Sequence, residues 1–193
     1  MRVFTGTAVV LSVVAAPLAS AQPSIEVGSH DLLPNTPGQT IEVFVTGGQA
    51  IETVNLNVQV GDGTNTNGPT IQGVDAITGT LFAPPNNDGG QFDILRDPQV
   101  FATTVATPPG TTIAADGLLA TIIIDTTGVN TGTYDLKLAD TLNDDTDLGF
   151  DINLNKIEPT ISNGQFTVVP EPASVLLLAA SGVMLMHRRR RDS

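Results

Sequence analysis

Apolar and polar residues alternate with a period of two through the middle of the chain, and short turn sequences separate the alternating segments. Ile41, Val43 and Val45 occupy every second position of one such segment, which stops at a Gly-Gly pair. The same alternation runs over residues 54–60, 134–138 and 164–168. Because successive side chains of a strand point to opposite faces, each segment is predicted to be a strand with one buried face.

Residues 118–124 are apolar at nearly every position, which predicts a central strand that is covered on each side. Weaker patterns predict strands near residues 24–27, 70–75 and 98–104, and no segment of the middle region is typical of a helix. About eight or nine strands separated by Gly, Pro, Asn and Asp predict an all-β fold, an antiparallel β-sandwich of the jelly-roll kind. A β-barrel is the less favoured alternative, and the lack of a fixed-period repeat argues against solenoids and propellers.

The first 21 residues are predicted to form a secretory signal peptide. Arg2 gives a short positive region, an apolar stretch follows, and Ala19 and Ala21 supply the small residues of a cleavage site. The alternative is an N-terminal membrane anchor, but the apolar stretch is short for a hydrocarbon core of about 30 Å.

The C-terminal residues 170–193 combine three features in a fixed order. Pro170, Glu171 and Pro172 form an extended segment, because proline disfavours helix. Residues 173–186 are apolar and would span about 21 Å as a helix. The sequence then ends in a basic cluster made of Arg188, Arg189, Arg190 and Arg191. Such a cluster holds its end in the cytoplasm, which predicts that residues 22–169 form one domain outside the inner membrane.

This tail resembles the PEP-CTERM protein-sorting signal, whose features are a Pro-Glu-Pro motif, a short transmembrane-like helix and a terminal arginine cluster. The resemblance implies recognition and cleavage by exosortase, an integral-membrane enzyme. It also implies a precursor held transiently in the inner membrane and delivery to the cell surface or an exopolysaccharide matrix. An ordinary tail anchor with an accidental Pro-Glu-Pro is the alternative.

Three segments of the middle region resemble cohesin-like domains of the carbohydrate-binding-module superfamily: residues 37–43, 117–122 and 161–168. The resemblance implies a non-catalytic jelly roll of nine strands, and the best known cohesins bind dockerin modules. No segment of the chain matches a dockerin-recognition motif.

Charge and composition limit the chemistry that the domain can perform. Residues 22–169 hold 18 acidic and three basic residues, a net charge of −15 that repels nucleic acids and argues against nucleic-acid binding. The absence of cysteine excludes disulfides, zinc–thiolate sites and a thiol nucleophile.

Residues 140–151 are rich in acidic residues, and Asp144, Asp145 and Asp147 are the candidate ligands if Ca²⁺ binds. A solvated, self-repelling loop is the favoured interpretation, because the glycine comes one residue too late for a calcium-binding loop pattern. No other cofactor is expected.

Few residues are candidates for catalysis or for sugar binding. His30 is flanked by Ser29 and Asp31, and this tripeptide is predicted to form a turn. The three residues are not expected to form a catalytic triad, because sequence neighbours point in different directions. Tyr134 shares the phase of buried leucines, whereas Phe44 is out of phase with its apolar neighbours and is predicted to be exposed. A glycosidase is disfavoured, because the chain has no tryptophan for sugar subsites. The sequence therefore predicts an exported, non-enzymatic surface or matrix protein that acts in adhesion or assembly. The alternative is a module that binds carbohydrate or a dockerin-type protein.

Overall fold

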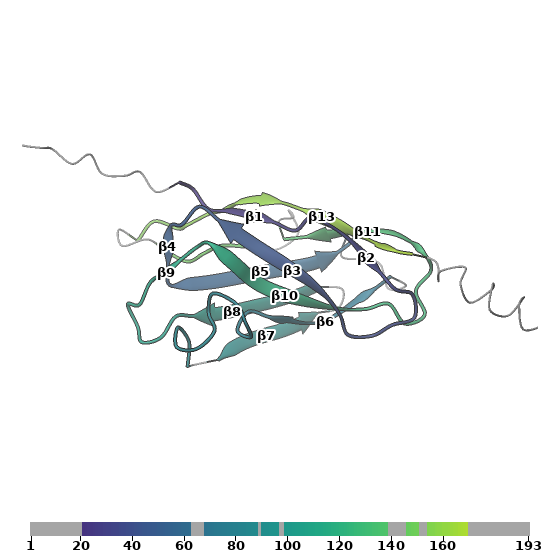
Figure 1. Ribbon diagram of the computed structural model, residues 1–193, viewed down its shortest axis with the longest axis horizontal. Helices are drawn as coiled ribbons and strands as arrows, with labels where there is room; N and C mark the ends of the chain where they lie inside the picture. The colour runs from purple at the N-terminus through teal and green to yellow at the C-terminus, as the bar shows by residue number, and fades with distance from the viewer. Residues whose placement is uncertain are drawn as a thin grey trace, which may run out of the picture.

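The computed structural model describes residues 21–62, 68–88, 90–96, 99–138, 146–150 and 154–169 of the chain. In these residues, strands form two sheets packed face to face and one short two-stranded ribbon (Figure 1). The strands are β1 (Ser24–Glu26), β2 (Ser29–Leu32), β3 (Gln39–Thr46), β4 (Ala50–Ile51), β5 (Thr53–Val60), β6 (Thr70–Asp75), β7 (Gln91–Arg96), β8 (Gln99–Val105), β9 (Ile113–Ala114), β10 (Gly117–Asp125), β11 (Gly132–Lys137), β12 (Thr160–Ser162) and β13 (Gly164–Val168). The predicted β-sandwich is confirmed. The helices expected at the two ends lie outside the described residues.

The five-stranded sheet has the order β12-β1-β3-β10-β6. Its inner strands β3 and β10 pair in antiparallel fashion, with a bulge between Leu118 and Ala120. The predicted alternation of β3 is confirmed, since Ile41, Val43 and Val45 are buried. β10 is interior to the sheet as predicted, but only the face that carries Ile122 and Ile124 is fully buried. The opposite face of β10 is half-buried, so the prediction that both faces are covered was wrong.

The six-stranded sheet has the order β2-β13-β11-β5-β8-β7. Two pairings in the sandwich are parallel, β1 with β12 and β13 with β2, while the other strand pairs are antiparallel. These two parallel pairings result from the paths of the first and the last strands of the described chain. β1 and β2 are consecutive parts of one segment that changes sheet at Gly28, and β12 and β13 run beside them in the same direction. The antiparallel prediction holds for all the other strand pairs that the structure describes.

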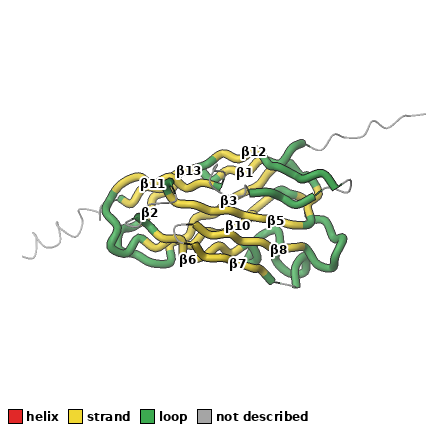
Figure 2. The backbone as a smooth tube through the Cα atoms, turned by 180° about the vertical axis from the view of Figure 1, so that it is seen from behind, coloured by secondary structure: helices red, strands yellow, loops and turns green. Residues whose placement is uncertain are grey.

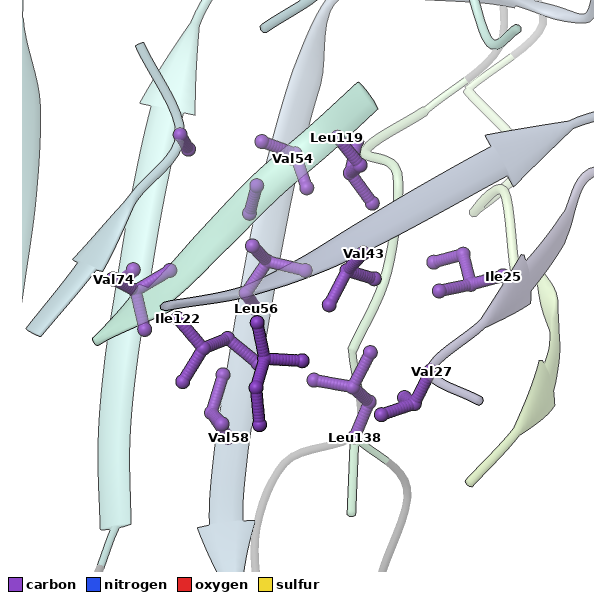
Figure 3. Close-up of a cluster of buried hydrophobic side chains, with 14 of the residues drawn as sticks. Ile25, Val27, Val43, Val54, Leu56, Val58, Val74, Leu119, Ile122 and Leu138 are labelled. Carbon is purple, nitrogen blue, oxygen red and sulfur yellow. The ribbon is translucent and has the colours of Figure 1, made fainter. Parts of the chain in front are cut away.

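The core lies between the two sheets and consists of aliphatic side chains with two buried phenylalanines. Figure 3 shows Val43 and Ile122 of the five-stranded sheet close to Leu56 and Val58 of the six-stranded sheet. These four side chains are at most 1% exposed. Fully burying a side chain of this size contributes about 1.5–3 kcal/mol, so the two inner faces are the main source of stability.

Gln91 connects the two sheets at one edge of the sandwich. Its side-chain oxygen accepts a hydrogen bond of 2.6 Å from the backbone N–H of Ala76, and its side-chain nitrogen donates to the carbonyl of Val74. β7 is therefore fixed beside the end of β6 although it belongs to the other sheet. The outer face of β7 is thus held in a defined position.

The described chain enters and leaves the sandwich at opposite ends of its long axis (Figures 1 and 2). β1 and the β4–β9 ribbon lie toward the end at which the chain enters, and the chain leaves at the other end, after β13. This separation decides which parts of the domain lie near the C-terminal tail.

Candidate functional site

An apolar patch lies on the outer face of the six-stranded sheet, at its β7 edge. The patch, called the β7–β8 patch here, consists of Phe92, Ile94, Phe101 and Val105. Phe92 lies opposite Thr103 and Ile94 opposite Phe101 in the β7–β8 ladder, so these side chains share one face. Residues of the opposite phase of β8 are buried, which identifies this face as the outer one. Phe92 is 60% and Val105 49% exposed. Large apolar side chains exposed together are typical of a binding surface.

A row of hydrogen-bonded polar side chains borders this patch. Thr103 donates through its hydroxyl to Asn55 Oδ1 at 2.6 Å, and Asn55 Nδ2 donates to Asp147 Oδ1 at 2.8 Å. Lys156 Nζ lies 3.6 Å from Asp147 Oδ2. Because each group restrains the next, this row forms a rigid polar border that can hydrogen-bond to a partner through the remaining donor and acceptor sites.

Asp147, one of the three predicted calcium ligands, holds the segment 146–150 against β5. Its Oδ1 also accepts from the Gly149 N–H at 2.9 Å, and its backbone pairs with that of Asn55. Asp144 and Asp145 lie outside the described residues. Within the described ranges, no three His, Asp or Glu side chains are placed to hold a metal ion. The calcium site stays a prediction.

A second candidate site is a groove of about 410 Å³ at the point where β1 passes into β2. We call it the β1–β2 groove, and its lining includes Glu26, Gly28, His30, Glu42 and Phe44. Phe44 is 47% exposed, as predicted from its phase in β3. His30 donates through Nε2 to the Val27 carbonyl at 2.6 Å, which fixes the ring at one side of the groove. An exposed aromatic ring beside carboxylate acceptors can hold a sugar ring.

Two predictions about side-chain roles can be checked directly. The turn predicted at Ser29, His30 and Asp31 is wrong, because these residues pair with β13 and form strand β2. Their side chains alternate between the two faces of β2 and do not assemble into a triad. Tyr134 is partly buried, and its ring stacks on that of Phe166 with 5.7 Å between the centroids. Its hydroxyl donates to the Asn130 carbonyl at 2.9 Å. Tyr134 therefore serves the packing of β11 on β13, as its phase predicted.

The predicted processing residues lie almost entirely outside the described part of the chain. Ala19, the Pro-Glu-Pro segment 170–172 and the arginines 188–191 are not among the described residues, whereas Ala21 is exposed at the start. Val169 is the last described residue, and its N–H donates to the Leu32 carbonyl at 3.0 Å. In the described ranges, no helix is long and apolar enough to span a bilayer.

The β7–β8 patch was not predicted from the sequence, because no strand was expected over residues 91–96. The signal is present: Phe92 and Ile94 alternate with Gln91 and Asp93. That pattern covers only four residues between Gly90 and the Asp97-Pro98 pair, which is short for a strand assignment.

Comparison with known proteins identifies the C-terminal segment. Residues 168–191 match the family model described as the PEP-CTERM protein-sorting motif. The chain therefore carries this motif, as its Pro-Glu-Pro and arginine cluster predicted. No curated protein matches the chain.

Solved structures with a similar fold include cohesins. The seventh ScaB type I cohesin of Pseudobacteroides cellulosolvens aligns with a TM-score of 0.61 and 14% identity, over 78% of this chain and 94% of that one. A chain of a type I cohesin–dockerin complex from Clostridium thermocellum aligns with a TM-score of 0.58 and 14% identity, over 77% and 99%. A non-cellulosomal cohesin from Archaeoglobus fulgidus aligns with a TM-score of 0.55 and 17% identity, over 80% and 96%. At these identities the comparison shows the fold, and the predicted cohesin-like sandwich is confirmed.

Proposed function

We propose that this protein is a non-enzymatic surface or matrix protein whose β-sandwich binds another protein through the β7–β8 patch. The PEP-CTERM motif marks the chain as an exported protein that exosortase processes. In this proposal, a signal peptide over residues 1–21 starts export, and residues 170–193 hold the precursor in the inner membrane until it is cut. The sandwich then acts at the surface in adhesion or assembly.

The observation that carries the binding proposal is the exposure of Phe92 beside Ile94 and Phe101 on a sheet edge. Aromatic side chains supply much of the binding energy at protein interfaces, where surrounding polar groups exclude water. Here the polar row that ends at Asp147 and Lys156 lies next to the apolar residues. An apolar centre with a polar border is the usual composition of such an interface.

A dockerin-type module is the partner class that the fold favours. Cohesins of similar fold occur in complexes with dockerins, as in Clostridium thermocellum. The present patch mixes an aromatic ring with branched aliphatic side chains, which suits the apolar face of a folded protein partner better than a sugar.

Two phenylalanines on opposite sheets give a matched test. Phe92→Ser removes the most exposed ring of the β7–β8 patch, and Phe44→Ser removes a ring of similar exposure from the outer face of the five-stranded sheet. For dockerin modules from the same genome, measured by calorimetry, we expect Phe92→Ser to weaken binding by roughly tenfold or more. Phe44→Ser should leave the affinity unchanged. Equal affinities of wild type and Phe92→Ser for a bound module would refute the assignment.

A second candidate function, carbohydrate binding, is favoured by the β1–β2 groove, where Phe44 lies near Glu26 and Glu42. The same two variants separate it from the first. If exopolysaccharide from the host is the ligand, Phe44→Ser lowers the affinity and Phe92→Ser does not. Binding of polysaccharide that neither variant alters would exclude the groove.

A further inference from the structure

The β1–β2 groove adjoins a second hollow, at the point where the chain changes from one sheet to the other. This hollow has a volume of about 320 Å³. Glu26 and Gly28 line both the groove and the hollow, and Gly28 has no side chain that would divide them. The other side chains of the hollow are neutral hydroxyls and amides, from Ser29, Ser162, Asn163 and Gln165. We call the groove and the hollow together the two-part cleft.

Two carboxylates flank the ring of Phe44 in the groove. Glu26 lies directly opposite Phe44 in the antiparallel β1–β3 ladder, and Glu42 lies two positions before Phe44 on the same face of β3. Such neighbours have Cβ atoms about 5 Å apart across the ladder and about 7 Å apart along one strand. All three side chains are exposed. The ring therefore has a negatively charged group on two of its sides.

These two carboxylates are not neutralised by a cation in the described part of the chain. The lining of the groove contains no lysine or arginine, and neither glutamate forms an ion pair with a described residue. His30 also lines the groove, and its Nε2–H is already donated to the Val27 carbonyl. A positively charged ligand would therefore meet two carboxylates that are free to bind it.

The spacing of the two glutamates suits an organic cation better than a metal ion. Glu26 and Glu42 are diagonal neighbours in the ladder, and such residues are about 7–8 Å apart. Calcium needs six to eight oxygen ligands, and no three acidic or histidine side chains of the described residues are placed to hold a metal ion. An ammonium group needs fewer acceptors, and it is also attracted by the face of an aromatic ring such as Phe44.

The second hollow favours a sugar chain over a basic peptide. Its hydroxyl and amide side chains both donate and accept hydrogen bonds, as sugar hydroxyls do. The charges beside the hollow are mixed, because Asp135 faces Gln165 in the β11–β13 ladder and Lys137 lies two positions after Asp135. A peptide with several lysines would find no carboxylate other than Glu26 in the lining of this hollow. A sugar chain can place one ring in the groove and its next rings in the hollow.

We infer that the two-part cleft binds a polysaccharide whose sugars carry free amino groups. One ring stacks on Phe44, its ammonium group is bound by Glu26 or Glu42, and the following sugars contact Ser29 and Gln165. The inference rests on the second candidate function, in which the groove binds carbohydrate, and it names the class of sugar. Residues 22–169 have a net charge of −15, so an acidic polysaccharide would be repelled from the same surface.

The first experiment compares two ligands that differ only in acetylation of their amino groups. Full-length protein in detergent is titrated by calorimetry with the hexamers of glucosamine and of N-acetylglucosamine, at a pH at which free amino groups are protonated. The salt concentration is about 0.15 M, which screens exposed charges beyond about 8 Å. We expect the glucosamine hexamer to bind several-fold more tightly, because only its amino groups are charged. Equal affinities for the two hexamers would contradict the inference.

A basic peptide provides the control for charge without sugar rings. Hexalysine with blocked ends carries the same number of positive charges as the glucosamine hexamer, but it has no ring to stack on Phe44. It should therefore bind more weakly than the glucosamine hexamer. Equal or tighter binding of hexalysine would show that the cleft is a site for basic peptides, and the inference would be wrong.

Variants show which side chains distinguish the two hexamers. Phe44→Ser should weaken binding of the glucosamine hexamer several-fold. Glu26→Gln/Glu42→Gln should remove the preference for glucosamine over N-acetylglucosamine. Asp31→Asn/Asp88→Asn removes the same charge from exposed residues that line neither part of the cleft, and it should keep the preference. Equal loss of the preference in both double variants would assign the attraction to the net charge of the domain and overturn the inference.

The second hollow is tested with Ser29→Ala/Gln165→Ala. These two residues are exposed and lie opposite each other in the β2–β13 ladder. The double variant should weaken binding of the glucosamine hexamer several-fold, without a change in thermal unfolding. An unchanged affinity would show that the sugar chain does not reach the hollow, which contradicts the inference.

A polysaccharide without amino groups separates the inference from the candidate function on which it rests. If such a polymer binds as tightly as the glucosamine hexamer and Phe44→Ser weakens its binding, the groove binds carbohydrate but the inference is wrong. If neither hexamer nor exopolysaccharide from the host binds, both the candidate function and the inference are wrong.

Discussion

Gly164, the first residue of β13, lies where the backbone of another strand comes closest. A Cβ atom built on Gly164 would lie 2.1 Å from the Gly28 carbonyl oxygen and 2.7 Å from Val27 Cγ1. The Gln165 N–H donates to that same carbonyl at 3.0 Å. A side chain at position 164 would therefore push β13 away from the segment that crosses between the sheets.

We predict that Gly164→Ala lowers the free energy of unfolding by about 1–3 kcal/mol, the usual cost of overpacking a tight contact. Denaturant unfolding of wild type and variant measures this difference. Gly73→Ala is the matched control, because a Cβ there meets only Ile123 Cδ1, at 4.0 Å. Equal losses in the two variants would show that the contact with Gly28 is not the cause of the destabilisation, because the entropy of the unfolded chain alone favours alanine over glycine.

At this scale, the sequence predicts which side chains are inside or outside more reliably than what they contact. The phase of Phe44 and that of Tyr134 were predicted correctly from alternation alone. The partners of Asp147 were not predicted. Asn55 lies 92 residues before Asp147 in the sequence, and Lys156 lies after the undescribed residues 151–153. A local sequence pattern does not reveal contacts between separate segments, but the period of a strand does reveal which of its side chains are buried.

Turns that follow two neighbouring strands are each held by an aspartate. Asp75 ends β6, and its Oδ1 accepts from the N–H groups of Ile77 and Thr78 at 2.8 and 2.7 Å. Asp125 ends β10, and its Oδ1 accepts from the Thr127 N–H at 2.7 Å. Partial burial raises the pKa of Asp75, but the hydrogen bonds from Thr78 and Ile77 together outweigh this and leave the pKa lowered. Hydrogen bonds from Thr127 lower the pKa of Asp125.

We predict that these two turns make the fold sensitive to acid. A carboxylate whose pKa is lowered by folding stabilises the protein above its ordinary value, here 3.8, and this stability is lost as the pH falls through the lower folded value. Thermal unfolding of wild type should therefore show a steep loss below about pH 4. Asp75→Asn/Asp125→Asn keeps a side-chain acceptor in each turn, and its unfolding should depend less on pH in this range. Parallel curves for the two proteins would contradict the role of these turns.

The strands predicted correctly are those with a long alternation that ends at glycines, such as β3 and β5. β2 and β12 were missed because they have only three or four residues and pair with strands far away in the sequence. β7 pairs with the next strand, β8, and was missed because its alternation is short. The parallel pairing of β1 with β12 has no local signal, because it depends on where the two chain ends meet. Local pattern therefore determines the inner strands, and tertiary contacts determine the edges.

The whole domain combines a strongly acidic surface with chain ends that lie at opposite ends of the sandwich (Figure 2). Acidic residues outnumber basic ones by 18 to three over residues 22–169. The described chain enters at one end of the sandwich and leaves at the other (Figure 2). The β7–β8 patch lies on the outer face of the six-stranded sheet, along the side of the sandwich, where a partner can reach it. In the proposed function, membrane attachment and binding are thus assigned to different parts of the chain.

The excess of negative charge also predicts how salt affects the stability of the molecule. Like charges repel more strongly in the compact state than in the unfolded chain, so screening should favour folding. Raising the ionic strength from about 0.01 to 0.15 M shortens the screening length from about 30 to 8 Å. We expect the free energy of unfolding to rise by about 1 kcal/mol over this range.

Glu26 and Glu42 are exposed carboxylates on the neighbouring strands β1 and β3. Glu26→Gln/Glu42→Gln removes two of the repelling charges, and its stability should therefore rise less with salt than that of the wild type. If stability falls as salt is added, attraction within pairs such as Lys156–Asp147 outweighs the general repulsion, and the acidic surface does not limit the stability of the fold.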